Sequence, residues 1–90
     1  MSSKYHTYSG NMAEADRNKR IGDIFISSDS PKFIIAKHYY ETAESLYSDA
    51  ALIASLYGEK KLKETALSKM YGCANLVKDC NRQINSVSVK

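Results

Sequence analysis

The sequence has little of several residue types that mark particular protein classes. Its 90 residues include two cysteines, one proline, no tryptophan and four glycines that stand singly. Two cysteines cannot hold together a secreted domain of this size, and isolated glycines form no phosphate-binding loop. The longest apolar run, Ala50 to Ala54, is far shorter than the roughly 20 residues that a membrane-spanning helix needs. We therefore expect neither a disulfide scaffold nor a membrane span, and the N-terminus lacks the apolar stretch typical of a signal peptide.

The rest of the composition is that of an ordinary globular chain. Hydrophobic residues make up 43% and charged residues 26%, and 13 basic against 10 acidic residues give a net charge of +3. These values predict a single folded domain with a small core. A net charge of this size is modest for a nucleic-acid-binding protein.

The N-terminal part of the chain predicts a flexible tail followed by a helix. Residues 1–10 have no hydrophobic period, so Tyr5, His6 and Tyr8 belong either to an unstructured leader or to a short recognition motif. Asn11 is a preferred N-cap residue, and Glu14 lies three residues later, where a capping box places its carboxylate. We expect this helix to bury Ile21, Ile24 and Phe25 and to stop at the polar residues 27–30.

The clearest start signal precedes a long second helix. Ser30 can cap it, Pro31 suits its first position, and no helix breaker follows until Gly58. Two apolar stripes follow at helical spacing, and a helix that is apolar on two faces must contact two neighbours. We therefore expect this helix at the centre of the fold. The first stripe consists of Phe33, Ala36, Tyr40, Ala43, Tyr47, Ala50, Ala54 and Tyr57, and the second of Tyr39, Leu46 and Ile53.

A third helix is expected from Gly58, which can provide a left-handed C-cap for the second, to about residue 86. Its main stripe is Leu62, Ala66, Met70, Cys73, Val77, Cys80 and Ile84, with Leu67, Tyr71 and Ala74 beside it. The prediction is an all-α fold, a three-helix antiparallel bundle of residues 11–86, with a flexible tail at 1–10 and a C-terminal tail at 87–90.

Two segments of this pattern resemble tetratricopeptide repeats. Ile21-Gly22 with Phe25, followed by Ala36, Tyr40 and Ala43, is similar to one repeat, and Ile53-Ala54 with Tyr57, followed by Ala66, Met70 and Cys73, to a second. The second-helix positions recur at an interval of 30 residues, against about 34 in that family. No proline or glycine breaks the chain between Leu46 and Ile53, where a repeat boundary would lie. The helix instead resembles the second helix of microtubule-interacting-and-trafficking domains, at positions Ala36, Tyr40, Ala43, Leu46, Tyr47 and Ala50. Both families bind other proteins and catalyse nothing, so the resemblance implies an interaction module built from helical hairpins.

No residue pattern indicates an active site or a metal site. Cys73 and Cys80 lie about 10.5 Å apart along a helix, beyond disulfide reach, and have no partner at zinc-site spacing. We expect both to be buried small hydrophobes in a reducing, cytoplasmic location. His38 has no nucleophile in reach, and Glu41 and Glu44 lie on a polar helix face. The expectation is no enzymatic activity, no cofactor and no metal.

The second apolar stripe predicts a binding groove between helices two and three. In this hypothesis Tyr39, Leu46 and Ile53 face Leu67, Tyr71 and Ala74 and bind a helical or extended peptide. Lys60, Lys61 and Lys63 open the third helix, where the helix dipole disfavours positive charge, so we expect them to steer an acidic peptide or amphipathic helix. One alternative is a small cytoplasmic chaperone or inhibitor, of bacterial secretion or phage type, that folds with one obligate partner. A homodimer is a further alternative, and a basic nucleic-acid-associated protein is less favoured.

Overall fold

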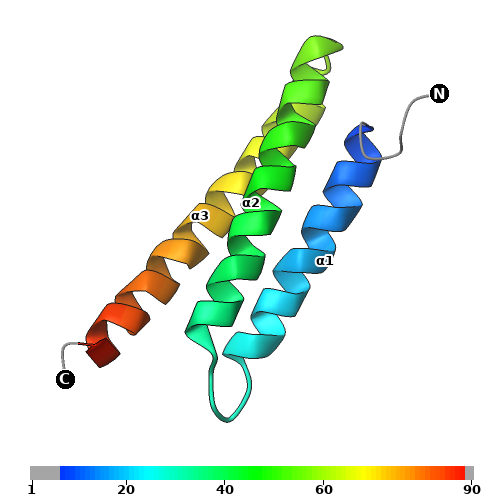
Figure 1. The fold of residues 1–90 in the computed structure, drawn as a ribbon. Coiled ribbons are helices and arrows are strands. Elements are labelled where there is room, and N and C mark those ends of the chain that lie inside the picture. The colour runs from blue at the N-terminus through cyan, green and yellow to red at the C-terminus, as the bar shows by residue number, and fades with distance from the viewer. Residues whose placement is uncertain (1–6, 89–90) are drawn as a thin grey trace.

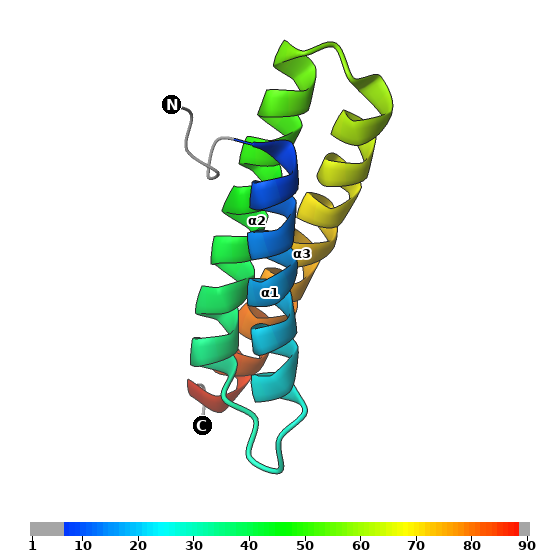
Figure 2. The ribbon, with the colours of Figure 1, turned by 90° about the vertical axis from the view of Figure 1, so that its right-hand side faces the viewer.

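The fold is an antiparallel bundle of three α-helices (Figure 1). The computed structural model describes residues 7–88, with side chains to residue 86. Helix α1 spans Tyr8–Ile26, α2 spans Phe33–Leu56 and α3 spans Lys60–Ser88. Helix α2 packs against both other helices, and α1 lies in front of the seam between α2 and α3 in Figure 2. The predicted three-helix, all-α architecture and the central place of the second helix are therefore confirmed.

Helix α1 begins earlier than predicted. Its N-cap is Thr7, whose Oγ1 accepts a hydrogen bond of 2.9 Å from the Gly10 amide. Tyr8 belongs to the first helical turn, and its hydroxyl donates to the carbonyl of Leu62 in α3 at 2.9 Å. Asn11, the predicted cap, lies inside the helix and is 5% exposed. A bond between helices thus supports the earlier start, whereas the other predicted tail residues of interest, Tyr5 and His6, lie outside the described residues.

Helix α2 begins slightly later than predicted. Its first residue is Phe33, and the cap residue Lys32 makes no side-chain capping bond, so the predicted cap at Ser30 is wrong. Pro31 precedes the helix instead of occupying its first position. The Lys32 amide donates to the carbonyl of Phe25 in α1 at 3.1 Å, which ties the start of α2 to the preceding helix.

The turn between α2 and α3 forms as the sequence predicts. Gly58 has a φ of 71°, in the left-handed region that favours glycine. Its amide donates to Ser55 at 3.1 Å, and the Glu59 amide donates to Ala54 at 2.9 Å, which are the two bonds of a Schellman motif. The chain therefore reverses within a few residues. Helix α3 then continues to Ser88, past the predicted end at residue 86.

The core follows the main apolar stripes of α2 and α3. Six predicted positions of α2 and three of α3 are at most 2% exposed, and both cysteines are among them, as predicted. Tyr57, the last position of the α2 stripe, is instead 79% exposed, because α2 extends past the start of α1. The buried positions are Ala36, Tyr40, Ala43, Tyr47, Ala50 and Ala54 in α2, and Ala66, Cys73 and Cys80 in α3.

The buried face of α1 differs from the prediction. Ile24 is 65% exposed, whereas the inward positions are Asn11, Ala15 and Gly22. Small residues are needed there because the ring of Tyr40 reaches the α1 backbone. A Cβ atom on Gly22 would lie 2.7 Å from Cε1 of that ring, well inside van der Waals contact. The close approach of α1 and α2 therefore determines which face of α1 is buried, and the hydrophobic period of a sequence contains no information about that distance.

Candidate functional site

The most regular polar contacts are two tyrosine–aspartate pairs between α1 and α2. The Tyr40 hydroxyl donates to Asp23 at 2.6 Å, and the Tyr47 hydroxyl donates to Asp16. Both rings are buried, and burial followed by the bonded aspartate raises the pKa of each tyrosine above its usual value. The two tyrosines are seven residues apart in α2, and the two aspartates are seven residues apart in α1, so the pairs fix the register of the two helices. Sequence reasoning missed them, although this shared seven-residue spacing was a readable signal.

The two cysteines have the chemistry of core residues. Burial raises the pKa of the Cys73 thiol to about 11 and also raises that of Cys80. A protonated thiol is a poor nucleophile and a poor metal ligand. Within residues 7–86, no three side chains of histidine, cysteine, aspartate or glutamate gather closely enough to hold a metal ion. In the described part of the chain, no helix has an apolar stretch long enough to cross a membrane.

Tyr39, in the first half of the predicted groove, is turned towards α1. Tyr39 stacks on Phe25 of α1, with ring centroids 5.9 Å apart and an angle of 13° between the planes. Leu46 packs against a core cluster that contains Ala15 of α1 and Cys73 of α3, and Ile53 is half-buried. Tyr39 therefore fills the seam between α1 and α2 and does not face α3.

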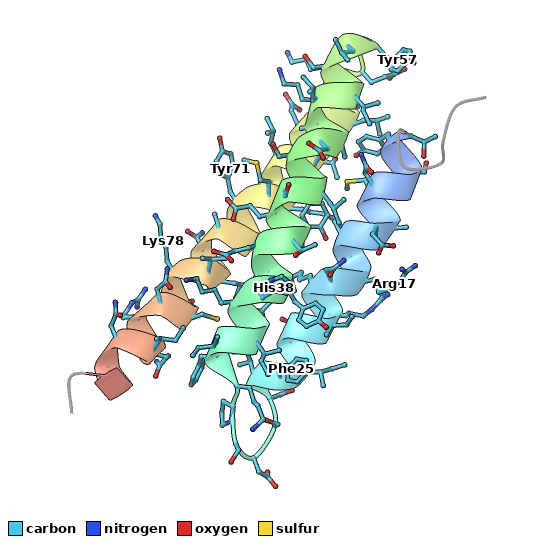
Figure 3. All side chains as sticks on the ribbon, in the orientation of Figure 1. Arg17, Phe25, His38, Tyr57, Tyr71 and Lys78 are labelled. Carbon is cyan, nitrogen blue, oxygen red and sulfur yellow. The ribbon has the colours of Figure 1, made fainter. Side chains whose placement is uncertain are left out.

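Within the second half of the predicted groove, Tyr71 lies on the other side of the hairpin. Tyr71 is 61% exposed and, with Lys78, projects from α3 on the side away from α1 (Figure 3). Leu67 packs against the alanine cluster of α2 and α3, and Ala74 is half-buried. The structure thus does not bring the side chains of Tyr39 and Tyr71 face to face. Helical spacing identifies a face of each helix, but only packing decides on which side its neighbour lies.

The lysine cluster is divided between two hollows. Lys60 and Lys63 line a hollow of about 320 Å³ at the α2–α3 turn, together with Ser55, Gly58 and Glu59. Lys61 lines a separate hollow of about 490 Å³ along α3, which it shares with Lys69. Each hollow also contains a glutamate, Glu59 in the first and Glu64 in the second, so negative charge is interspersed among the three lysines.

An apolar groove lies where the start of α2 meets the end of α3. It has a volume of about 600 Å³, and Ile34 and Ile35 on its wall are 70% and 40% exposed. A second hollow of about 380 Å³ shares Phe33 with it. The readable signal in the sequence was a run of large apolar residues, Phe33 to Ile35, because one helix face cannot bury three consecutive positions. This end groove is lined by Pro31, Lys32, Phe33, Ile34, Ile35, Gln83 and Ile84.

Exposed apolar side chains also gather at the opposite end of the molecule. Leu52, Leu56 and Tyr57 are 60%, 76% and 79% exposed. They belong to the last part of α2 and its C-cap, and this end of α2, with Tyr57, runs beyond the start of α1 (Figures 1 and 3). The hairpin end comprises these three residues and the charged Asp49, Glu59, Lys60, Lys61, Lys63 and Glu64.

Comparison of the chain with protein-family models, with curated proteins and with solved structures found no match. The function is therefore argued from the geometry of these surfaces.

Proposed function

We propose that this chain is a non-catalytic protein-interaction module whose end groove binds an apolar segment of another protein. The observation that carries the proposal is the groove itself: about 600 Å³ bounded mostly by aliphatic and aromatic side chains and open to solvent. Pockets of this size with few polar groups are typical binding sites. The end groove lies where α2 meets α3, and none of its lining residues belongs to the groove predicted from the sequence.

The chemistry of the occupant follows from the lining. Ile34, Ile35 and Ile84 suit aliphatic or aromatic side chains presented by a helix or an extended strand. Lys32 is the one charged residue among the lining residues, and it takes part in none of the ion pairs found within the described chain. We therefore infer a peptide segment with at least two large apolar side chains and a carboxylate beside Lys32.

The distribution of the other charges favours a protein over a nucleic acid as the partner. Arg17 pairs with Glu14, and Lys19 pairs with Asp23, so the basic residues of α1 are partly neutralised. The lysines at the start of α3 line two hollows, and each hollow also contains a glutamate. Tracking a phosphate backbone needs a continuous basic stripe, which these positions do not supply.

The buried polar groups are those of a structural core, which supports a non-catalytic role. The two buried tyrosine hydroxyls are bound to aspartates, and both thiols are held protonated by burial. Among the described side chains, no buried nitrogen or oxygen lacks a hydrogen-bond partner. A site for acid–base or nucleophilic chemistry would instead keep such a group free and aimed into a cavity.

The test is selection of short peptides from a randomised displayed library, followed by titration of the synthetic winners into the full chain. Selected peptides should carry apolar residues and an aspartate or glutamate. The Ile34→Asp variant should weaken their binding by about 10-fold or more, as expected for a central apolar contact. Lys32→Glu should weaken the binding of acidic peptides more than the binding of the same peptides with asparagine or glutamine in place of the acidic residue.

The matched control is Leu56→Asp, which changes a similarly exposed residue at the other end of α2. It should leave peptide binding unchanged. A library that yields no binder, or winners that bind Ile34→Asp as tightly as the original chain, would contradict the proposal. Circular dichroism of each variant establishes that the helices are retained.

A further inference from the structure

We infer that the hairpin end is a self-association surface, on which a second copy of this chain docks about a two-fold axis. The inference does not depend on the end groove, because it uses residues at the opposite end of the bundle. Leu52, Leu56 and Tyr57 expose 60%, 76% and 79% of their surface within one helical turn and its C-cap. Large aliphatic and aromatic side chains left this open on a small domain mark an interaction surface.

The charges around these side chains identify the second copy as the occupant. The hairpin end has three lysines, at 60, 61 and 63, and three carboxylates, at 49, 59 and 64. The ion pairs found within the described residues involve none of the six. A surface of zero net charge with unused groups of both signs is not complementary to an acidic peptide or an anionic membrane, both of which call for a positive excess. It is complementary to itself when rotated by two-fold symmetry, where each contact occurs twice.

The helical spacing shows how two copies fit together. Asp49, Leu52 and Leu56 follow one another at steps of three and four residues, so they share one face of α2. When two such faces pack antiparallel across a two-fold axis level with residue 54, midway between the two leucines, Leu52 of each copy meets Leu56 of the other. Asp49 of each copy then lies towards the α2–α3 turn of its partner, where Lys60 and Lys61 begin α3. The geometry points to a pair of equivalent Asp49–lysine contacts that flank an apolar centre.

The first test is sedimentation of the full chain at increasing concentration, up to about 0.5 mM, because small interfaces give weak dimers. The expected result is a reversible monomer–dimer equilibrium. Leu56→Asp should make the chain monomeric over this range. Ile34→Asp, a similarly exposed isoleucine at the other end of α2, is the matched control and should leave the dimer intact.

The second test exchanges the charges. Asp49→Lys alone puts lysine opposite lysine twice, and Lys60→Glu/Lys61→Glu alone puts carboxylate opposite carboxylate twice, so each variant should dimerise about 10-fold more weakly. Mixing the two variants restores opposite charges at both contacts, and a heterodimer should form with near-original affinity. All these positions are exposed, so the fold is retained, and circular dichroism checks this.

Three results would overturn the inference. One is a monomer at every concentration. Another is a dimer or filament that Ile34→Asp disrupts, because the end groove would then be the docking surface. The third is a pair of charge variants that gain nothing on mixing. A monomer that still binds the selected peptides would refute self-association while leaving the proposed function standing, and a dimer without peptide binding would do the reverse.

Discussion

Replacement of Gly22 by alanine tests how closely α1 and α2 approach. In an ordinary helix interior this change stabilises by about 1 kcal/mol, because alanine restricts the unfolded chain and favours helix. Here the new Cβ would lie 2.7, 2.9 and 3.0 Å from three carbon atoms of the Tyr40 ring. The ring is 2% exposed and its hydroxyl is bonded to Asp23, so it cannot move aside freely.

The magnitude follows from these opposing effects. Overpacking of a core costs about 1–3 kcal/mol. Displacing the ring also weakens a hydrogen bond to a charged group, which is worth about 1.5–3 kcal/mol. After subtracting the gain in helix propensity, we expect Gly22→Ala to lower the free energy of unfolding by about 2 kcal/mol and Tm by about 10 °C. Urea unfolding followed by circular dichroism measures the change.

The chain contains its own control. A Cβ on Gly72, in the exposed part of α3, would meet no atom within 4 Å. Gly72→Ala should therefore stabilise the protein by up to about 1 kcal/mol. Placing Gly22→Ala in a Tyr40→Ala background should remove most of its cost, since the two residues are coupled. Equal stabilisation by both glycine replacements would refute the close packing of α1 on α2.

Three further predictions concern the tyrosines and the turn. Unfolded tyrosine ionises near pH 10, whereas burial keeps Tyr40 and Tyr47 neutral in the folded protein. Above pH 10 the unfolded state therefore binds fewer protons than the folded state, and stability falls as pH rises. The free energy of unfolding should decline by about 1.4 kcal/mol per pH unit for each tyrosine, and the double replacement by phenylalanine should decline less steeply in urea titrations above pH 10. Gly58→Ala should lower the free energy of unfolding by about 1 kcal/mol, because alanine is strained in the left-handed backbone conformation. There is no steric clash to add to this, since no atom lies within 4 Å of the new Cβ. Thermal unfolding measures the change, and an unchanged Tm would contradict the prediction. Tyr39→Ala should lower the free energy of unfolding by about 1–2 kcal/mol through loss of its stacking on Phe25, whereas Tyr71→Ala, at an exposed position, should lower it by less than about 0.5 kcal/mol. Equal losses in denaturant unfolding would contradict the placement of Tyr39 against α1.

The second and third helices were the most predictable parts of the fold. Their stripes of alanine, tyrosine and cysteine have a strong helical period, and the αL glycine at 58 has one local role that its neighbours cannot take. The first helix was harder to predict. Its buried face depends on the Tyr40 ring, 18 residues away in the chain, so Gly22 is inside and Ile24 is outside. A large apolar residue at helical spacing is a good core candidate only when the neighbouring helix leaves room for it.

The candidate surfaces were predictable only in kind. The second apolar stripe of α2 is not what stays exposed, because Tyr39, Leu46 and Ile53 are half-buried, and the side chains of Tyr39 and Tyr71 lie on different sides of the hairpin. Apart from Tyr71, the exposed large apolar residues are at the two ends of the bundle. Tyr57 lies beyond the start of α1, and a hydrogen bond from Tyr8 to α3 supports that start.

The sequence by itself determined the number of helices, the turn at Gly58 and the buried faces of α2 and α3, because these depend on local backbone preference and on periodicity within one segment. Only the tertiary structure decided the inward face of α1, the pairing of Tyr40 and Tyr47 with their aspartates, and which apolar residues remain in contact with water. These features depend on the distance and side of approach between helices, and side-chain volume sets both only once the helices have packed together.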